Sequence, residues 1–304
     1  MQYELDKLSP CYKGGTLMTI DHITVVGAGV MGRGIAYVSA LAGFSTTLVD
    51  ISESQLQDAY EAAKQTANKG VDRGKLTIEQ KEMLLEKLQT STDLATVVKE
   101  TDFLIEAVPE KRAIKQAVLE EAEANAQDDV IFTSNTSTIS PTELGSYTNR
   151  PNKFAVMHFF NPVHLMKLVE IVRGLETTDE TVDVVRRVAE KMGKETVEVN
   201  EFPGFVTSRI SALVGNEAFH MLQEGVASAE DIDKAIKLGL NFPMGPLELG
   251  DLVGLDARLN NLRYLHEKLG EKFRPAPLLE QYVQAGRLGR KSGKGVYDYT
   301  KEED

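Results

Sequence analysis

The sequence has few features that would place the chain in a membrane or an oxidising compartment. Its 304 residues include a single cysteine, Cys11, so an internal disulfide is excluded and a cytoplasmic setting is indicated. No run reaches the roughly 18 consecutive apolar residues of a membrane span. Residues 1–17 lack the basic start and apolar core of a secretory signal, and we interpret them as an N-terminal extension without an assigned role.

Positive charge is also scarce. Lysine and arginine number 34 against 46 aspartates and glutamates, which gives a formal net charge of −12. Because nucleic-acid phosphates need a basic face, this charge argues against nucleic acid as a partner. An anionic small molecule must instead be met by a local cluster of lysines and arginines, against an unfavourable overall field.

Motifs for metal binding and for nucleophilic catalysis are missing as well. There is no GxSxG turn, and the five histidines do not stand at metal-ligand spacing from one another or from the cysteine: His22, His158, His164, His220 and His266. We therefore expect no metal site. Any catalytic histidine is expected to transfer protons instead.

A glycine-rich turn follows the first run of β-forming residues. Residues 22–26 lead into 27-GAGVMG-32, a helical segment follows at 34–43, and 46–50 predicts the next strand. Such a turn lets the backbone approach a pyrophosphate and lets the helix pack close to the sheet. The helix N-terminus adds unpaired N–H groups and the positive end of its dipole. The cofactor contacts expected here are Gly27, Gly29, Val30, Met31 and Gly32.

An acid at the end of the second strand completes this pattern. Asp50 stands 18 residues beyond Gly32, where it would accept hydrogen bonds from the adenosine ribose and repel a 2′-phosphate. The pattern therefore predicts NAD rather than NADP. The alternatives are glycines that serve only a tight turn and an acid that is merely solvated.

Strand-like and helical segments alternate through the first two thirds of the chain. Strands are predicted at 102–110, 130–137, 154–162 and 168–174, with a helix at 112–126. After 202-FPGF-205 the pattern is mostly helical, at 206–224, 230–238, 256–269 and 277–286. We therefore expect an α/β, Rossmann-type doubly wound sheet over residues 18–200 and a small all-α domain over 201–304.

A charged helical hairpin is predicted to interrupt the nucleotide-binding fold. Residues 53–90 have helical periodicity with a break at 70–74. Four basic residues lie within twelve positions of this segment: Lys64, Lys69, Arg73 and Lys75. One interpretation is an anion-binding arm, and the other is a solvated helical face.

One histidine stands out by its position. His158 lies in 157-MHFFNP-162, toward the end of a predicted strand, where open α/β sheets place ligands. Glu170 follows in the apolar run 168-LVEIV-172, where a buried carboxylate needs a partner. A return strand would bring the two together as an acid/base pair, although a hydrogen-bonded core histidine is the alternative. Ser137, after another strand, would bind a substrate oxygen or cap a helix.

Taken together, these segments resemble the L-3-hydroxyacyl-CoA dehydrogenase family, and within it bacterial 3-hydroxybutyryl-CoA dehydrogenases. The resemblance runs from about residue 20 to residue 299 and is carried by VVGAGVMGRGIA, IEAVPE, SNTSTIS, HFFNPV, LVEIV, FPGF, DIDKAIKLG, PMGPLELGDLVGLD and GRKSGKGVYDY. It implies NAD-dependent interconversion of (S)-3-hydroxyacyl-CoA and 3-ketoacyl-CoA, and a homodimer formed through the helical domain.

The resemblance also implies roles for individual residues. His158 would exchange the proton of the 3-hydroxyl, Glu170 would support the imidazolium, and Ser137 would bind the 3-oxygen. Lys69 and Arg73 of the hairpin would meet the CoA phosphates. Further positions that match cofactor contacts are Glu110, Lys115, Asn161 and Lys291.

One departure from the family pattern is chemical. The family has Val/Ile-Val-Asn-Arg after PGF, whereas this chain has 206-VTSR-209. Ser208 therefore replaces an asparagine that helps to orient the substrate. Serine is shorter and lacks the amide donors, although a bound water would restore part of the contact. The turnover rate and the preferred acyl group are the properties that this change affects.

Two other functions stay open at this point. One is oxidation of a CoA-free hydroxy acid or of a dicarboxylic substrate such as 3-hydroxyadipyl-CoA. The other belongs to a different class, a non-catalytic NAD-binding sensor or structural protein, which only Ser208 favours.

Overall fold

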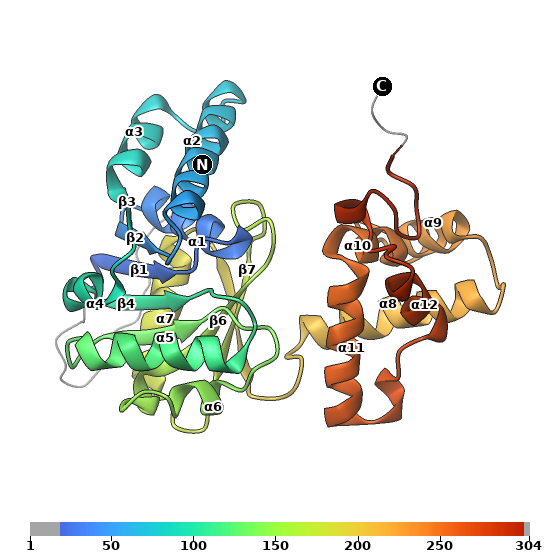
Figure 1. The fold of residues 1–304 in the computed structure, drawn as a ribbon. Helices are drawn as coiled ribbons and strands as arrows, with labels where there is room; N and C mark the ends of the chain where they lie inside the picture. Colours follow the sequence, from blue (N-terminus) through green and yellow to red (C-terminus); the bar gives the residue numbers. More distant parts are fainter. Residues whose placement is uncertain (1–18, 301–304) are drawn as a thin grey trace, which may run out of the picture.

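The computed structural model describes residues 19–300 as a sheet-containing part followed by a helical part (Figure 1). The expected extension at residues 1–17, with Cys11, lies outside the described residues. One eight-stranded sheet has the order β3-β2-β1-β4-β5-β6-β7-β8. Its strands are β1 (His22–Val26), β2 (Ser45–Val49), β3 (Leu88–Ser91), β4 (Phe103–Glu106), β5 (Ile131–Ser134), β6 (Phe154–Phe159), β7 (Leu168–Arg173) and β8 (Glu195–Asn200).

All neighbouring strands are parallel except β6 and β7, which are antiparallel. The order of the first six strands is that of a doubly wound dinucleotide-binding fold, so the predicted Rossmann-type architecture is confirmed. The strand order reverses between β1 and β4. In sheets of this kind, ligands bind beyond the carboxyl ends of the strands at that point.

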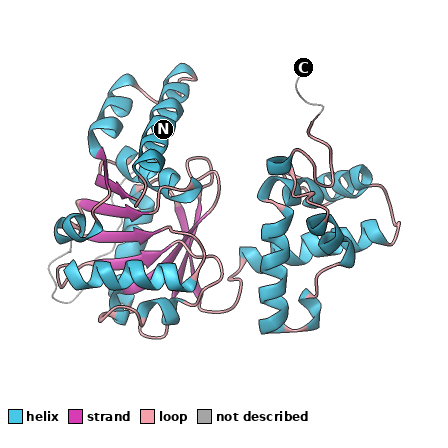
Figure 2. Cartoon of the chain, viewed as in Figure 1, coloured by secondary structure: helices cyan, strands magenta, loops and turns pink. Residues whose placement is uncertain are grey.

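Helices cover both faces of the sheet (Figure 2). Because side chains alternate along a strand, each strand contributes to two cores. On β1, Val25 and Val26 belong to different cores. The first core includes side chains of α1 (Val30–Leu41), α2 (Glu53–Asp72), α3 (Ile78–Lys87) and α7 (Asp179–Lys191). The second includes those of α4 (Leu94–Val97), α5 (Arg112–Asn125) and α6 (Pro141–Gly145).

The predicted helical hairpin is confirmed as α2 and α3. Ser52 caps α2 through the amide of Gln55, and Thr77 with Gln80 forms a capping box at the start of α3. Such caps satisfy N–H groups that have no partner within the helix. In Figure 1 the hairpin extends upward from the sheet.

A small cluster of apolar side chains joins the sheet to the chain that leaves it. Val156 on β6 pairs with Val172 on β7, and two positions further along His158 pairs with Glu170. These four side chains share one face of the sheet, because side chains repeat every second residue. Phe205, from the segment after β8, packs on Val156 and Val172.

The helical part has its own core, built from α8 (Thr207–Gln223), α9 (Ala229–Gly239), α10 (Pro246–Val253), α11 (Leu255–Leu269) and α12 (Pro277–Gln284). The sequence did not reveal α10, because 243-PMGP-246 reads as a break; Pro246 instead occupies the first turn, where its missing N–H costs nothing. It also did not reveal the short strand β3 or the final α7–β8 pair.

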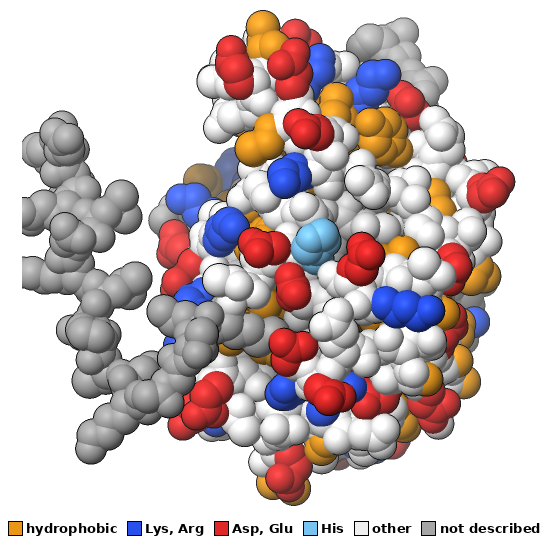
Figure 3. Space-filling view, turned by 90° about the vertical axis from the view of Figure 1, so that its left-hand side faces the viewer, with side chains coloured by type: hydrophobic (Ala, Val, Ile, Leu, Met, Phe, Trp, Pro, Cys, Tyr) orange, Lys and Arg blue, Asp and Glu red, His pale blue; other side chains and the backbone are white. Residues whose placement is uncertain are grey.

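Among residues 19–300, no helix has both the length and the apolar character needed to cross a bilayer. On the face of the sheet-containing part seen in Figure 3, acidic, basic and apolar side chains are interspersed. This face therefore presents no extended basic surface.

Candidate active site

The glycine turn lies where β1 passes into α1. Gly27 has φ +106°, and a Cβ there would lie 2.7 Å from the Ala107 carbonyl oxygen at the end of β4. A Cβ on Gly32 would lie only 1.7 Å from the carbonyl oxygen of Gly27. The turn and the helix are thus packed too closely for any side chain at these two positions.

The space beside the start of α1 is open. A Cβ on Gly29 would meet no atom within 4 Å, and Val30 is 54% exposed. The first turn of α1 contains no acidic residue, and no side chain caps it. Its N–H groups and the positive end of the helix dipole therefore face open space. This geometry fits the pyrophosphate of a dinucleotide.

Asp50 lies one residue beyond β2 and also supports the turn. Its Oδ2 accepts a hydrogen bond from the amide of Ala28 at 2.8 Å, and its Oδ1 accepts one from the amide of Ser52 at 3.0 Å. A carboxylate can accept about four hydrogen bonds, so capacity for ribose hydroxyls remains. The sequence did not predict that the acid would also hold the glycine loop.

A buried ion pair lies at the end of β4. The Lys115 ammonium donates to both oxygens of Glu106, at 2.8 and 2.9 Å, and lies 3.2 Å from Glu110. The Lys115 and Glu106 side chains are 1% and 0% exposed, so Lys115 has little surface left for a cofactor. Burial raises the pKa of Glu106, while the Lys115 charge opposes that rise.

Glu110 is more accessible, and it organises the loop after β5. It accepts hydrogen bonds from the hydroxyls of Thr136 and Thr138 and from the amide of Ser137. Burial acts to raise the pKa of Glu110, but the Lys115 charge and the two hydroxyls outweigh it and hold this pKa below its usual value. Glu110 therefore links the ion pair to Ser137.

An imidazole and a carboxylate face one another across β6 and β7. The antiparallel register puts His158 directly opposite Glu170, and Nδ1 of His158 lies 2.8 Å from Oε2 of Glu170. The His158 Nε2 lies 3.0 Å from the Ser137 hydroxyl. His158 is 5% exposed and Glu170 is fully buried. The structure thus brings together the three residues on which the sequence placed the chemistry.

The far side of Glu170 is closed by the start of the helical part. The amide of Thr207 donates to Oε1 at 2.9 Å, and its hydroxyl donates to Oε2 at 3.1 Å. Burial acts to raise the pKa of Glu170, but the hydrogen bonds from His158 and Thr207 outweigh burial and lower it. The sequence did not identify Thr207 as part of this site.

Aromatic rings enclose the imidazole. The ring centroids of Phe160 and Phe205 lie 4.6 and 5.6 Å from that of His158. Phe205 has φ +48°, which is unusual for a residue with a side chain. The chain adopts this conformation where it leaves the sheet, and it places an apolar ring over the acid/base pair.

Other predicted site residues differ in their surroundings. Asn161 is exposed just beyond β6, and Ser208 is half-buried in the first turn of α8. Lys291 is not brought to the glycine turn. It lies in the helical part, with its ammonium 2.5 Å from Asp256.

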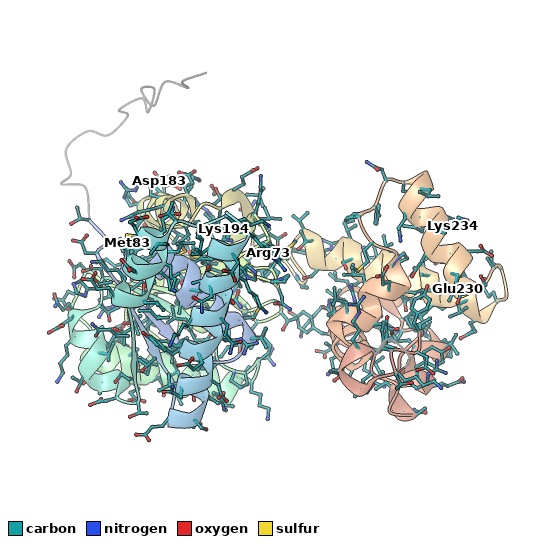
Figure 4. All side chains as sticks on the ribbon, turned by 90° about the horizontal axis from the view of Figure 1, so that it is seen from above. Arg73, Met83, Asp183, Lys194, Glu230 and Lys234 are labelled. Carbon is teal, nitrogen blue, oxygen red and sulfur yellow. The ribbon has the colours of Figure 1, made fainter. Side chains whose placement is uncertain are left out.

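The hairpin lines a basic cavity of about 660 Å³. It includes Lys69 and Arg73, and the remaining basic lining comes from Lys75, His164, Lys167, Lys191 and Lys194. No acidic residue of the described chain lines it. Figure 4 shows Arg73 and Lys194 on the half of the sheet-containing part that is turned toward the helical part. Lys194 has a structural task, because its ammonium donates to the carbonyls of Val163 and Met166.

Within residues 19–300, no group of three or more histidine, cysteine or acidic side chains is placed to hold a metal ion. The turn, the acid after β2 and the histidine–carboxylate pair at the same sheet edge instead define an NAD-dependent oxidoreductase.

Comparison with known proteins identifies the family. The 3-hydroxyacyl-CoA dehydrogenase NAD binding domain matches residues 22–202, and the 3-hydroxyacyl-CoA dehydrogenase C-terminal domain matches residues 204–299. The chain belongs to the 3-hydroxyacyl-CoA dehydrogenase family, which confirms the resemblance inferred from the sequence motifs.

Relatives cover nearly the whole chain. A probable 3-hydroxybutyryl-CoA dehydrogenase of Bacillus subtilis is 43% identical over 94% of this chain and 99% of its own length. The structure of (S)-3-hydroxybutyryl-CoA dehydrogenase from Ralstonia eutropha matches with a TM-score of 0.89 and 42% identity, over 93% of this chain and 100% of that one. A diketoreductase acting on dicarbonyl compounds matches at 33% identity and a TM-score of 0.81, over 93% of this chain and 100% of that one.

Proposed function

We propose that the protein interconverts a short-chain (S)-3-hydroxyacyl-CoA, with 3-hydroxybutyryl-CoA as the preferred substrate, and its 3-ketoacyl-CoA, with His158 as the acid/base. The observation that carries this proposal is the imidazole held between the Glu170 carboxylate at 2.8 Å and the Ser137 hydroxyl at 3.0 Å. The names of the relatives support the choice of acyl chain.

In the proposed mechanism, Glu170 fixes the tautomer of the imidazole. Nδ1–H donates to the carboxylate, so Nε2 is left as the base that faces Ser137. NAD, bound at the glycine turn with Asp50 near the adenosine ribose, supplies the hydride acceptor. When the 3-hydroxyl is oxidised, its proton passes to Nε2, and in the reverse direction the imidazolium returns that proton to the 3-oxygen.

The remaining members of the site position the substrate and cofactor. The Ser137 hydroxyl is proposed to hydrogen-bond the 3-oxygen, and Ser208 to bind the acyl group through a water. We propose Glu110 and Asn161 as cofactor contacts because both lie beyond the carboxyl ends of strands at the sheet edge. Lys115 would act through Glu110, and Lys291 would need the two parts of the chain to move closer together.

The basic cavity is the proposed binding site for the CoA phosphates. Lys69 and Arg73 are exposed, and the cavity they line is free of acidic side chains in the described chain. Local charge there would offset the overall net charge of −12. The Lys69→Ala/Arg73→Ala variant is expected to raise the KM for acetoacetyl-CoA about tenfold or more, with kcat changed less than threefold, because it loses two phosphate contacts. An unchanged KM would remove the hairpin from CoA binding.

We also propose that residues 18–200 and 201–304 act as cofactor and substrate domains, and that the helical domain forms a homodimer. The helical domain exposes large apolar side chains of the kind that protein interfaces cover. They are Ile210, Leu238, Leu240, Leu252 and Val253. The single cysteine supports a cytoplasmic setting. Light scattering coupled to gel filtration measures the mass; a monomer at micromolar concentration would contradict the dimer.

Acetoacetyl-CoA with NADH, followed at the nicotinamide absorbance, tests the proposed reaction. His158→Gln is expected to slow turnover by roughly 10²–10⁴-fold, the usual contribution of a positioned acid/base. His22→Gln is the matched control, because this exposed histidine begins β1, at the edge of the sheet opposite to the site. An effect below tenfold for His158→Gln would mean that another group transfers the proton.

A CoA-free substrate is the second candidate, and the diketoreductase among the relatives favours it. A comparison of kcat/KM for acetoacetyl-CoA, for its dicarboxylic analogue 3-oxoadipyl-CoA and for free acetoacetate separates these substrates. Higher kcat/KM for free acetoacetate would overturn the CoA proposal. Absence of turnover with every substrate would instead favour a non-catalytic NAD-binding protein.

A further inference from the structure

The buried carboxylate of the acid/base pair receives three hydrogen bonds. His158 Nδ1 and the Thr207 hydroxyl both contact Oε2 of Glu170, at 2.8 and 3.1 Å, while the Thr207 amide donates to Oε1 at 2.9 Å. Oε2 therefore serves the imidazole and the threonine hydroxyl at the same time. The two donors compete for the negative charge of one oxygen.

Thr207 comes from a different part of the chain than the pair it contacts. It is the first residue of α8, whose start has no side-chain cap and no acidic residue in its first turn. An N–H group at such an end needs an acceptor. Glu170 supplies that acceptor from β7, so the carboxylate is fixed from the sheet side by His158 and from the helical side by Thr207.

Apart from His158, the side chain that donates to Glu170 is that of Thr207. Of the described residues, His158 is the only titratable group in contact with Glu170; Ser137 contacts the far ring nitrogen, and the rings of Phe160 and Phe205 flank the imidazole. The Thr207 hydroxyl, which donates to the carboxylate, is therefore the polar group best placed to change how strongly Glu170 attracts the imidazolium.

We infer that Thr207 is a positioning residue whose hydroxyl, by sharing Oε2 of Glu170 with His158, sets the pH range in which the acid/base pair works. The inference rests on the proposed function. With the hydroxyl present, its hydrogen bond stabilises part of the negative charge of the carboxylate. Glu170 then stabilises the imidazolium less strongly. Removal of the hydroxyl leaves Oε2 to the imidazolium alone, which favours the protonated ring.

Thr207→Val tests this inference, because valine keeps the shape and the backbone amide but removes the hydroxyl. Oxidation needs the neutral ring and reduction needs the protonated one. The midpoint of the pH profile of kcat/KM is therefore expected to move upward by about half to one pH unit in both directions of reaction, the size of one lost hydrogen bond. Thr207→Ser keeps the hydroxyl and is expected to restore the wild-type midpoint.

A second variant separates this effect from a change in how the two parts of the chain are held. The Thr142 hydroxyl donates to Glu201, in the segment that leaves the sheet, without touching His158 or Glu170. Thr142→Val thus removes a hydroxyl–carboxylate contact near the same connection, and its midpoint is expected to stay at the wild-type value. The inference is overturned by an unchanged or lowered midpoint in Thr207→Val, or by an equal rise in Thr142→Val.

Failure of the proposed function has a different signature. In that case His158→Gln would keep its activity, whatever the profile of Thr207→Val. If only the inference about Thr207 fails, His158→Gln shows its expected loss of roughly 10²–10⁴-fold, while the midpoint of Thr207→Val does not rise, or rises equally in Thr142→Val.

Discussion

Replacement of Lys115 by methionine is expected to destabilise the protein more than any single surface change near the cofactor site. The ammonium is 1% exposed and donates to both oxygens of Glu106, which is fully buried. Without it, the carboxylate keeps only the Ser134 hydroxyl, at 2.5 Å, and the Val108 amide, at 2.7 Å. Removal of one partner of a buried ion pair costs about 3–5 kcal/mol.

The loss is expected to depend on pH, and its sign follows from Glu106. Burial already raises the pKa of Glu106. A glutamate whose pKa is raised by folding stabilises the fold while it is protonated. This stabilisation is complete below the ordinary pKa of glutamate, and it is lost as the pH rises through the pKa in the folded protein. Because Lys115→Met removes the charge that opposes the rise, the variant should fall further below the wild type at pH 8 than at pH 5.

Urea unfolding followed by circular dichroism at both pH values measures this difference. Lys111→Met is the matched control, because Lys111 is exposed at the N-cap of the same helix and should change stability by less than about 0.5 kcal/mol. Adding Glu106→Gln to Lys115→Met should recover part of the loss, since no buried charge is left unpaired. A loss below 1 kcal/mol, or one that grows at pH 5, would refute this account of the pair.

Four further variants probe the site. Gly32→Ala should destabilise the fold as well as abolish NADH binding, because its Cβ would lie 1.7 Å from a backbone oxygen, whereas Gly29→Ala should fold normally and weaken NADH binding alone in a fluorescence titration. Ser208→Asn should keep or raise activity on acetoacetyl-CoA, and a large loss would show that serine suits another substrate. Glu170→Gln should lower stability at pH 7, and this loss should shrink as the pH falls toward and through the lowered pKa of Glu170, because the contribution of the ionised carboxylate is lost there. A loss that stays equal as the pH falls, measured by thermal unfolding, would contradict this.

Much of the fold follows from periodicity and turn chemistry. The glycine turn, the strand that ends before Asp50 and the antiparallel return that pairs His158 with Glu170 depend on local pattern and short connections. The β3 strand, LQTS, has too little apolar character to stand out, and α10 begins with a proline that resembles a break. Whether these segments form a strand or a helix depends on tertiary packing, which cannot be inferred from the local sequence pattern.

The candidate site divides in the same way. Ser137, His158 and Glu170 lie at ends of neighbouring strands, so the sheet order alone brings them together. The contact of Thr207 with Glu170 and the tie between Asp50 and Ala28 depend on where a later or earlier segment settles. Sequence spacing contains no signal for such contacts, apart from the rule that a buried acid and an uncapped helix both require partners.

That rule explains why one carboxylate joins the chemistry to the fold. Burying Glu170 without donors would favour its protonated form, and a neutral acid would no longer stabilise an imidazolium. The start of α8 has the converse need, since no side chain of its own end caps it and the amide of Thr207 donates to Glu170. The carboxylate accepts the helix amide and the amide supplies the carboxylate with a donor, so the pKa of Glu170 stays lowered despite its burial. The helical domain therefore contributes to the acid/base pair through the first residue of its first helix.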